Sequence, residues 1–307
     1  FAEEIGMPIV ALNHSSEINQ LLKSVTRLAP APGIPEGHPV IVAARELGVE
    51  ICSELELAYR FEQRRGIGPR PMVGITGTDG KTTTTLMAAA IIESAGLRTL
   101  AVGNTDLPLI SALDTDAQAF AVECSSFRLA HIQQFRMRAS AWLNFAPDHL
   151  DWHPNLNDYF AAKAKMWAHC IEGDIAVAPF DNQQIVDIAQ ASKARVVTFG
   201  IADGDYHVNE GWLCGPMGRI MPISDMGRSL PHDVTNALAA AAVCLESGLA
   251  TVADAAIALQ KFVNAPHRIQ FVGENDGVRW FNDSKATSPH AVSVALKSFE
   301  SIVLIAS

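Results

Sequence analysis

A glycine-rich turn followed by a lysine and four threonines carries the clearest chemical signal in the sequence. Residues 77–82 read Gly-Thr-Asp-Gly-Lys-Thr, between an apolar run at 72–75 and a helical stretch at 82–95. Such a turn points backbone N–H groups and a helix N-terminus at a phosphate, which Lys81 can neutralise while the Thr82 hydroxyl ligates Mg²⁺. We therefore predict a nucleotide site. A tight strand-to-helix turn with a chance Gly-Lys-Thr is the alternative, because Ile75 stands where a strict phosphate loop has glycine.

Other ionisable residues follow apolar runs farther along the chain. Glu123 comes directly after residues 119–122, where a carboxylate suits a hard cation, although a surface or cap residue is the alternative. Asp148, His149 and Asp151 follow the run 139–145, and this cluster favours a metal or phosphate site over a structural histidine. Lys163 stands in a helical stretch and by itself is typical of a solvated lysine.

These residues need a scaffold that brings strand ends together. Predicted strands cover residues 72–75, 98–102, 119–122 and 139–145, and each ends in polar residues. Continuous apolar strands that alternate with helices favour an α/β fold, a mostly parallel sheet with helices on both faces. Ligands gather at the carboxyl ends of the strands in such sheets, so we expect the candidate residues there.

The segments on either side of this sheet are predicted to be separate units. The helices, loop and linker expected before the sheet cover residues 39–47, 55–65, 28–35 and 66–71. A second boundary is expected at 264–267, and further strands are expected at 269–273, 278–282 and 301–306. The chain begins as if within a helix and ends with a strand, so we expect both outer units to be incomplete.

Composition and charge exclude several classes of protein. The 307 residues are 49% hydrophobic and 18% charged, enough for two cores or more. A net charge of -10 without a basic face argues against a nucleic-acid partner. The five dispersed cysteines are typical of reduced cytoplasmic thiols, and no apolar run reaches membrane-spanning length. We therefore expect a cytoplasmic protein with no nucleic-acid or membrane partner.

Several short motifs, taken in their order along the chain, resemble those of the Mur ligases, which make the cytoplasmic precursor of bacterial peptidoglycan. They read Gly-Thr-x-Gly-Lys-Thr-Thr, Glu-x-Ser-Ser-Phe, Asp-His-Leu-Asp, Ala-Ala-Lys, Thr-Asn-Ala-Leu-Ala, Pro-His-Arg and Asn-Asp-Ser-Lys-Ala-Thr. The resemblance runs from about residue 9 to the last residue. Residues 148–151 and 282–287 are most similar to members that add D-glutamate to UDP-N-acetylmuramoyl-L-alanine.

The resemblance implies three domains, with incomplete Rossmann-like domains on both sides of a central P-loop ATPase domain. Residues 1–70 would be part of a UDP-substrate-binding domain, 71–265 the ATP-binding domain, and 266–307 the start of an amino-acid-binding domain. No Gly-x-Gly-x-x-Gly loop precedes the first strand, and the chain stops before a D-glutamate site. We expect a monomer that folds around its central domain, has a frayed C-terminal end, and does not form the amide bond in this form.

The resemblance also implies roles for individual residues. Those implied to bind ATP are Gly77, Thr78, Asp79, Gly80, Lys81, Thr82, Thr83, Asn236, Arg268 and Asp283. Those implied to hold Mg²⁺ are Thr82, Glu123, His149 and Lys163, with Lys163 converted by CO₂ into a carbamate that offers oxygen ligands. Those implied to contact the muramoyl substrate are Gly33, Asn104, Ser125, Lys285 and Thr287. The catalytic set would be Lys81, His149 and Lys163.

The implied reaction joins a carboxylate to an amine at the expense of ATP. Mg²⁺ and Lys81 would screen the repulsion between the substrate carboxylate and the γ-phosphate, and D-glutamate would attack the resulting acyl phosphate. Departures at Ala31, Asp79, Pro147 and Asp233 bear on ligand affinity and leave the reaction class unchanged. The alternatives are another ligase of this superfamily, such as one that adds glutamate to folate, a P-loop switch NTPase, or a non-catalytic nucleotide-binding fragment.

Overall fold

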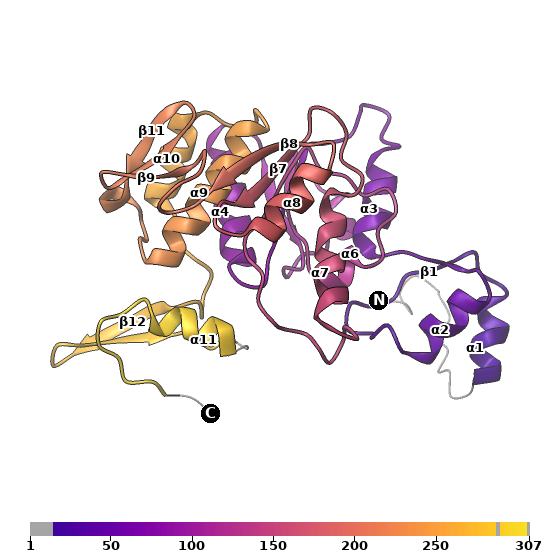
Figure 1. The fold of residues 1–307 in the computed structure, drawn as a ribbon. Helices are drawn as coiled ribbons and strands as arrows, with labels where there is room; N and C mark the ends of the chain where they lie inside the picture. Colours follow the sequence, from indigo (N-terminus) through magenta and orange to yellow (C-terminus); the bar gives the residue numbers. More distant parts are fainter. Residues whose placement is uncertain (1–14, 287–288, 306–307) are drawn as a thin grey trace.

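A six-stranded parallel sheet forms the centre of the protein in the computed structural model, which describes residues 15–286 and 289–305 (Figure 1). Its strands lie in the order β4-β5-β3-β6-β7-β8. Their bounds are β3 (Met72–Thr76), β4 (Thr99–Gly103), β5 (Ala119–Glu123), β6 (Ala139–Trp142), β7 (Ile175–Pro179) and β8 (Arg195–Phe199). Strands β3, β5, β6 and β7 are buried along their whole length, as expected for strands covered on both faces. The predicted α/β fold and its first four strands are confirmed.

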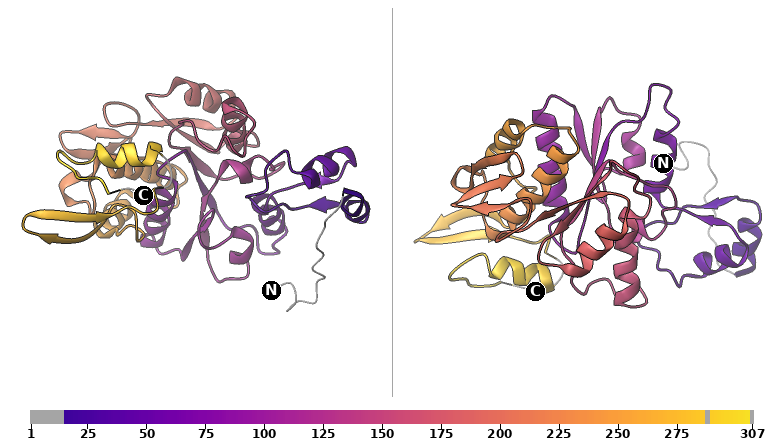
Figure 2. Two further views of the ribbon diagram at one scale, coloured as in Figure 1. Left: turned by 90° about the horizontal axis from the view of Figure 1, so that it is seen from below. Right: turned by 45° about the horizontal axis from the view of Figure 1, so that its top comes forward.

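Helices cover both faces of the sheet (Figure 2). An apolar core lies on each face, between the sheet and the helices that cover it. One face carries α4 (Lys81–Ser94), α9 (Pro231–Glu246) and α10 (Val252–Lys261). The other carries α3 (Glu54–Glu62), α5 (Leu109–Ala112), α6 (Ser126–Leu129), α7 (Leu156–Ala164), the 3₁₀ helix η1 (Lys165–Trp167) and α8 (Gln183–Ala191). Successive side chains of a strand alternate between the faces, so β5 gives Ala121 to the first core and Phe120 to the second.

The register of the sheet aligns the carboxyl ends of the strands that precede the candidate residues. Glu123 lies opposite Gly103 of β4 and opposite Ile75 of β3. Strand β6 ends at Trp142, earlier than the predicted 145. There the chain leaves the sheet, and the Asn144 side chain hydrogen-bonds to the loop that follows β3. The strand ends therefore meet at one edge, where a site can form.

The N-terminal elements form a small layer with an apolar cluster of its own. They are α1 (Ser15–Leu22), α2 (Pro39–Glu46), and the parallel pair β1 (Arg27–Leu28) and β2 (Glu50–Ile51). Ile18, Leu22 and Ala44 pack together there. Helix α3 packs with the sheet instead, since Leu55 and Ala58 belong to the core that contains Phe120.

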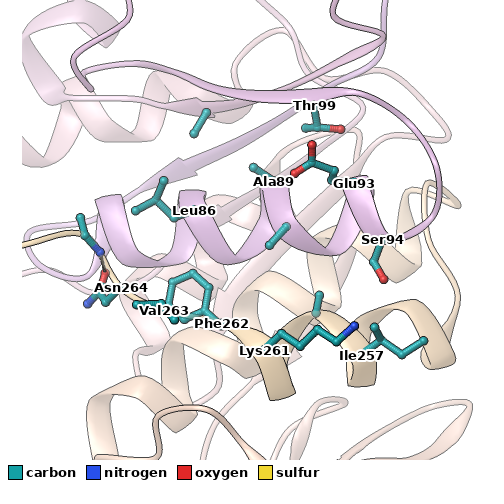
Figure 3. Close-up of a pocket in the computed structure, with 14 residues that line it drawn as sticks. Leu86, Ala89, Glu93, Ser94, Thr99, Ile257, Lys261, Phe262, Val263 and Asn264 are labelled. Carbon is teal, nitrogen blue, oxygen red and sulfur yellow. Dashed lines mark hydrogen bonds between the residues drawn. The ribbon is translucent and has the colours of Figure 1, made fainter.

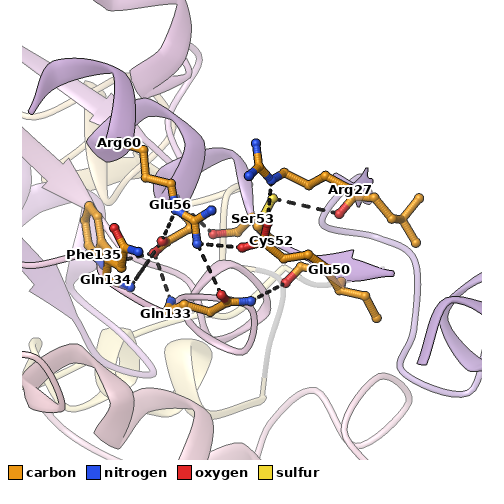
Figure 4. Close-up of polar contacts among 11 residues, drawn as sticks. Arg27, Glu50, Cys52, Ser53, Glu56, Arg60, Gln133, Gln134 and Phe135 are labelled. Carbon is orange, nitrogen blue, oxygen red and sulfur yellow. Dashed lines mark hydrogen bonds and ion pairs between the residues drawn. The ribbon is translucent and has the colours of Figure 1, made fainter. Parts of the chain in front are cut away.

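A buried carboxylate fixes α3 to the loop that precedes β6 (Figure 4). Glu56 is 0% exposed, and its carboxylate accepts hydrogen bonds from the backbone N–H groups of Gln133, Gln134 and Phe135 at 2.9–3.0 Å. It also accepts one from Nε of Arg60 at 2.6 Å. Burial alone would raise the pKa of Glu56, but these donors hold that pKa below its usual range.

Smaller elements lie beyond the sheet. They are the antiparallel β9 (His207–Asn209), β10 (Trp212–Gly215) and β11 (Gly218–Pro222), the 3₁₀ helix η2 (Ile223–Asp225), the hairpin of β12 (Gln270–Asn275) and β13 (Val278–Asn282), and α11 (Pro289–Leu296). The strand predicted at 301–306 is wrong for the residues described, because 301–305 form no strand. A strand needs a hydrogen-bonding neighbour, and in the described chain β12 and β13 pair only with each other. Within the same residues, no helix is long and apolar enough to cross a bilayer.

Replacing Glu56 with Gln should destabilise the fold, because an amide nitrogen would then face backbone donors. We expect the free energy of unfolding at pH 7 to fall by about 1–3 kcal/mol, the usual penalty for unsatisfied buried donors. The native pKa of Glu56 is lowered, so its contribution is complete above the unfolded-state pKa and is lost as the pH falls through the native pKa. The urea midpoints of parent and variant should therefore converge in acid.

The matched control for this experiment is Glu93→Gln on the exposed side of α4, which should leave the urea midpoint unchanged. A Glu56→Gln protein as stable as the parent at pH 7 would contradict the role given to this carboxylate.

Candidate functional site

The loop between β3 and α4 is shaped by a glycine and held by an asparagine. Gly80 has a φ of 79°, and a Cβ there would lie 2.5 Å from Oδ1 of Asn236, so only glycine fits. The backbone N–H groups of Thr78 and Asp79 both donate to Oδ1 of Asn144 at 2.9 Å. Sequence reasoning gave Asn144 no role, although its position after β6 was a signal. The loop is thus preformed, with α4 beginning directly behind it.

The Lys81 amine lies folded over this loop. Its Nζ donates to the Thr78 carbonyl at 2.6 Å, and burial lowers the pKa of Lys81. The opposing charge of Glu123 limits this effect by favouring the protonated amine. An anion bound at the loop would favour the protonated Lys81 amine further. The loop and Lys81 together therefore provide a site suited to phosphate.

Four predicted residues from distant parts of the chain meet at the start of α4. The Thr82 hydroxyl donates to Oε2 of Glu123 at 2.7 Å, and the Asn104 amide donates to Oε1 of the same carboxylate at 3.1 Å. Nη2 of Arg268 donates to the Thr82 hydroxyl at 2.9 Å. Glu123 is 2% exposed, so these partners satisfy a carboxylate that would otherwise be costly to bury. This cluster combines a hydroxyl, a carboxylate and a guanidinium beside the loop between β3 and α4.

Lys163 is the most deeply buried cationic side chain near the loop. It is 1% exposed, its Nζ donates to the Gly77 carbonyl at 2.5 Å, and it lies 4.7 Å from the centre of the Tyr159 ring. Burial, and after it the positive charge of Lys81, holds the pKa of Lys163 well below its usual range. Lys163 is therefore neutral more often than an ordinary lysine, and the neutral amine is the form that reacts as a nucleophile.

His149 lies against aromatic rings and carries a strained backbone. Its φ is 54°, and its ring centre is 4.8 Å from that of Phe127 and 5.9 Å from that of Tyr159. Its Nε2 lies 3.5 Å from a carboxylate oxygen of Asp148, while burial lowers the pKa of the imidazole. A neutral imidazole can act as a ligand, and the unusual φ points to a position fixed by its surroundings.

A divalent cation at this site would need oxygen atoms from water or phosphate as well as from the protein. Among the residues that the structure describes, no three His, Cys, Asp or Glu side chains come close enough to hold a metal ion. The neighbouring oxygens of Thr82 and Glu123 nevertheless form a donor set that fits Mg²⁺, which usually keeps several water or phosphate ligands. The donor set therefore fits a Mg²⁺–nucleotide complex better than a free ion.

The other predicted residues lie outside the cluster of Thr82, Glu123, Asn104 and Arg268. Ser125 is buried and caps α6, accepting a hydrogen bond from the Arg128 N–H at 3.4 Å. Gly33 is exposed in the loop before α2, and a small cavity separates this loop from Phe127. Asp283 accepts from the Ile269 N–H at 3.0 Å, and the Lys285 N–H donates to the His267 carbonyl at 3.1 Å. Thr287 lies outside the described residues.

A separate groove of about 670 Å³ runs between α4, β4 and α10 (Figure 3). Apart from Asn264, its lining is largely apolar, with Glu93 and Lys261 among the exceptions, and it contains none of the predicted site residues. The Asn264 side chain lies 3.1–3.2 Å from the hydroxyl of Thr83, in the first turn of α4. The groove therefore adjoins the start of α4 without forming part of the loop between β3 and α4.

Comparison with known proteins links this geometry to one family. The family description "Mur ligase middle domain" matches residues 75–244, more than half of the chain. The UDP-N-acetylmuramoylalanine–D-glutamate ligase of Frankia casuarinae is 37% identical over 288 residues, covering 90% of this chain and 59% of that protein. The ligase of the same name from Escherichia coli K12 is 34% identical over 296 residues, covering 94% and 65%. The chain thus spans about six-tenths of the length of these relatives.

Solved structures of more distant proteins share the fold. MurF from Acinetobacter baumannii superposes with a TM-score of 0.65 at 18% identity, covering 92% of this chain and 75% of that one. MurF ligase from Thermotoga maritima, solved in complex with ADP, gives a TM-score of 0.63 at 18% identity, covering 90% and 75%. With the sheet, the loop and the matched family domain in agreement, the chain belongs to the Mur ligase family.

Proposed function

We propose that this chain is the nucleotide-binding part of a cytoplasmic ligase that adds D-glutamate to UDP-N-acetylmuramoyl-L-alanine. The observation that carries the proposal is the meeting of Thr82, Glu123 and Arg268 beside Lys81 at the carboxyl edge of the sheet. The names of the relatives support the choice of amino acid. In this proposal residues 1–70 contact the UDP-substrate, 71–265 bind ATP, 266–307 begin an amino-acid-binding domain, and the enzyme is a monomer.

The residues at the loop would reduce the electrostatic repulsion between the two anionic reactants. A substrate carboxylate must approach the γ-phosphate of ATP, and both are anions. Lys81, Arg268 and the N–H groups at the start of α4 would reduce this repulsion and favour formation of an acyl phosphate. Mg²⁺, held by Thr82 and Glu123, would supply Lewis-acid stabilisation of the phosphate oxygens. The amino group of D-glutamate then displaces phosphate from the acyl carbon.

Lys163 would take part through a carbamate. Its neutral amine nitrogen attacks the carbon of CO₂, forms an N–C bond and loses a proton, which gives a carbamate anion with two oxygens. Such a group supplies oxygen ligands where an ammonium would repel a cation. The lowered pKa of Lys163 supports this step because it increases the fraction of unprotonated amine. His149, as a neutral imidazole, would be a further ligand of Mg²⁺ beside the Lys163 carbamate.

The activity is tested with the full-length gene product that contains this sequence. Given UDP-N-acetylmuramoyl-L-alanine, ATP and Mg²⁺, it should release ADP only when D-glutamate is added, and mass spectrometry should detect the new amide. Faster product formation with another amino acid, or with a folate acceptor, would reassign it to another ligase of the superfamily. ADP release without an acceptor would indicate a nucleotide hydrolase, and nucleotide binding without turnover would indicate a non-catalytic protein.

Lys81→Ala should weaken binding of Mg²⁺–ATP to this chain about ten- to hundredfold, because a cation that contacts phosphate oxygens is removed. Isothermal titration calorimetry measures the affinity directly. Lys193→Ala, a change at an exposed lysine before β8, is the matched control and should bind ATP as the parent does. Equal affinity of Lys81→Ala and parent would refute the assignment of the loop.

Lys163→Ala should abolish ligase activity in the full-length gene product, and Lys163→Glu should retain more activity because glutamate restores an oxygen ligand. The parent supplied with ¹³C-bicarbonate should also give a carbamate carbon resonance that Lys163→Ala lacks. Lys165→Ala, two residues along at the surface, is the control for both measurements. Equal loss in the Ala and Glu variants, with no carbamate signal in the parent, would count against this role.

A further inference from the structure

A fully buried carboxylate at the start of α9 has an arginine as its strongest partner. Asp233 is 0% exposed, and its Oδ2 accepts from Nε of Arg228 at 2.6 Å and from the Leu230 N–H at 3.3 Å. A buried carboxylate without a compensating cation is strongly destabilising, so the fold favours the conformation in which the Arg228 guanidinium pairs with Asp233.

The same guanidinium contacts the segment that follows the central domain. Nη1 of Arg228 donates to the backbone carbonyl of Arg268 at 2.5 Å, while Nη2 lies 3.2 Å from Nε2 of His232. Because the guanidinium is rigid and planar, its contact with Asp233 fixes the direction of its contact with Arg268. The Arg228–Asp233 pair is thus connected by a hydrogen bond to a backbone carbonyl 40 residues farther along the chain.

The backbone on either side of Arg268 is strained. His267 has a φ of 64° and Ile269 a φ of 45°, a region that β-branched residues rarely adopt. Such conformations persist only where surrounding contacts impose them. Here the Ile269 N–H donates to Asp283 at 3.0 Å, and the Arg268 carbonyl between the two strained residues accepts from Arg228. The strained turn aims the Arg268 side chain at the Thr82 hydroxyl, 2.9 Å away.

We propose that Arg228, oriented by Asp233, is a positioning residue that holds the strained Arg268 turn so that the Arg268 guanidinium reaches the nucleotide site. The inference rests on the proposed ATP site and adds to it a pair outside the residues proposed to hold phosphate and Mg²⁺. In this inference the role of the Asp233 carboxylate is to orient Arg228.

The test is a double-mutant cycle of ATP affinity on this chain, using Arg228→Lys, Arg268→Met and the double variant. Lysine at 228 keeps a positive charge beside Asp233, so the protein should fold, but a single amine cannot reproduce the guanidinium fork. Arg228→Lys alone should weaken Mg²⁺–ATP binding roughly three- to tenfold, the effect of one lost hydrogen bond. In the Arg268→Met background it should have no further effect.

Hydrogen exchange gives a second measurement. In Arg228→Lys, amides of the peptide covering residues 266–271 should exchange faster, while those of the central sheet should not change. The matched control is Arg195→Lys, which alters an Arg–carboxylate pair with Glu246 at the opposite end of α9 and should leave both measurements unchanged.

The outcomes separate the two proposals. If Arg268→Met weakens ATP binding but Arg228→Lys does not, the positioning role is refuted and the ATP site stands. An equal loss from Arg228→Lys with and without Arg268 would also refute it. If the parent does not bind ATP, the proposed site itself fails and the inference fails with it. If Arg268→Met binds ATP as the parent does, Arg268 takes no part in nucleotide binding, so the positioning role is refuted while the site at Lys81 stands.

Discussion

The candidate site depends on one constraint, the parallel alignment of β4, β5, β3 and β6 with their carboxyl ends at a common edge. In this register Glu123 comes level with Gly103 and with Ile75, so the residues that follow each strand lie within hydrogen-bonding distance. Asn104 and Thr82 both bond to the Glu123 carboxylate, and Asn144 holds the loop that precedes α4. A sheet with a different strand order would keep every local motif and still separate these groups.

The electrostatics of the site favour negatively charged ligands. The Lys81 amine is directed at a carbonyl oxygen of the β3–α4 loop, and the Arg268 guanidinium donates to Thr82 at the start of α4. Glu123 is already engaged by Thr82 and Asn104. A bound triphosphate would supply the missing negative charge, and its binding energy would come largely from groups already in place.

The late part of the chain completes a site begun by the early part. Arg268 reaches Thr82 across 186 positions, and Asn264 reaches Thr83 across 181. Both contacts lie at the point where the chain leaves α10 for the β12–β13 hairpin, and the backbone there is strained at His267 and Ile269. Any movement of the hairpin relative to the sheet would therefore change the contacts of Arg268 and Asn264 with the start of α4.

The sequence by itself determined the fold class, the first four strands of the central sheet and the residue types of the site. Apolar runs, a glycine turn and a helix start are local patterns, so the α/β class, the first four strands, and the loop that contains Lys81 and Thr82 could all be predicted. Only the tertiary structure decided which distant groups meet: the bonds of Asn144 to the loop, the packing of α3 on the sheet, the pairing of Arg228 with Asp233, and the absence of a strand at 301–305. These features depend on strand order and on the availability of a pairing partner, which are properties of the whole fold that a local pattern does not contain.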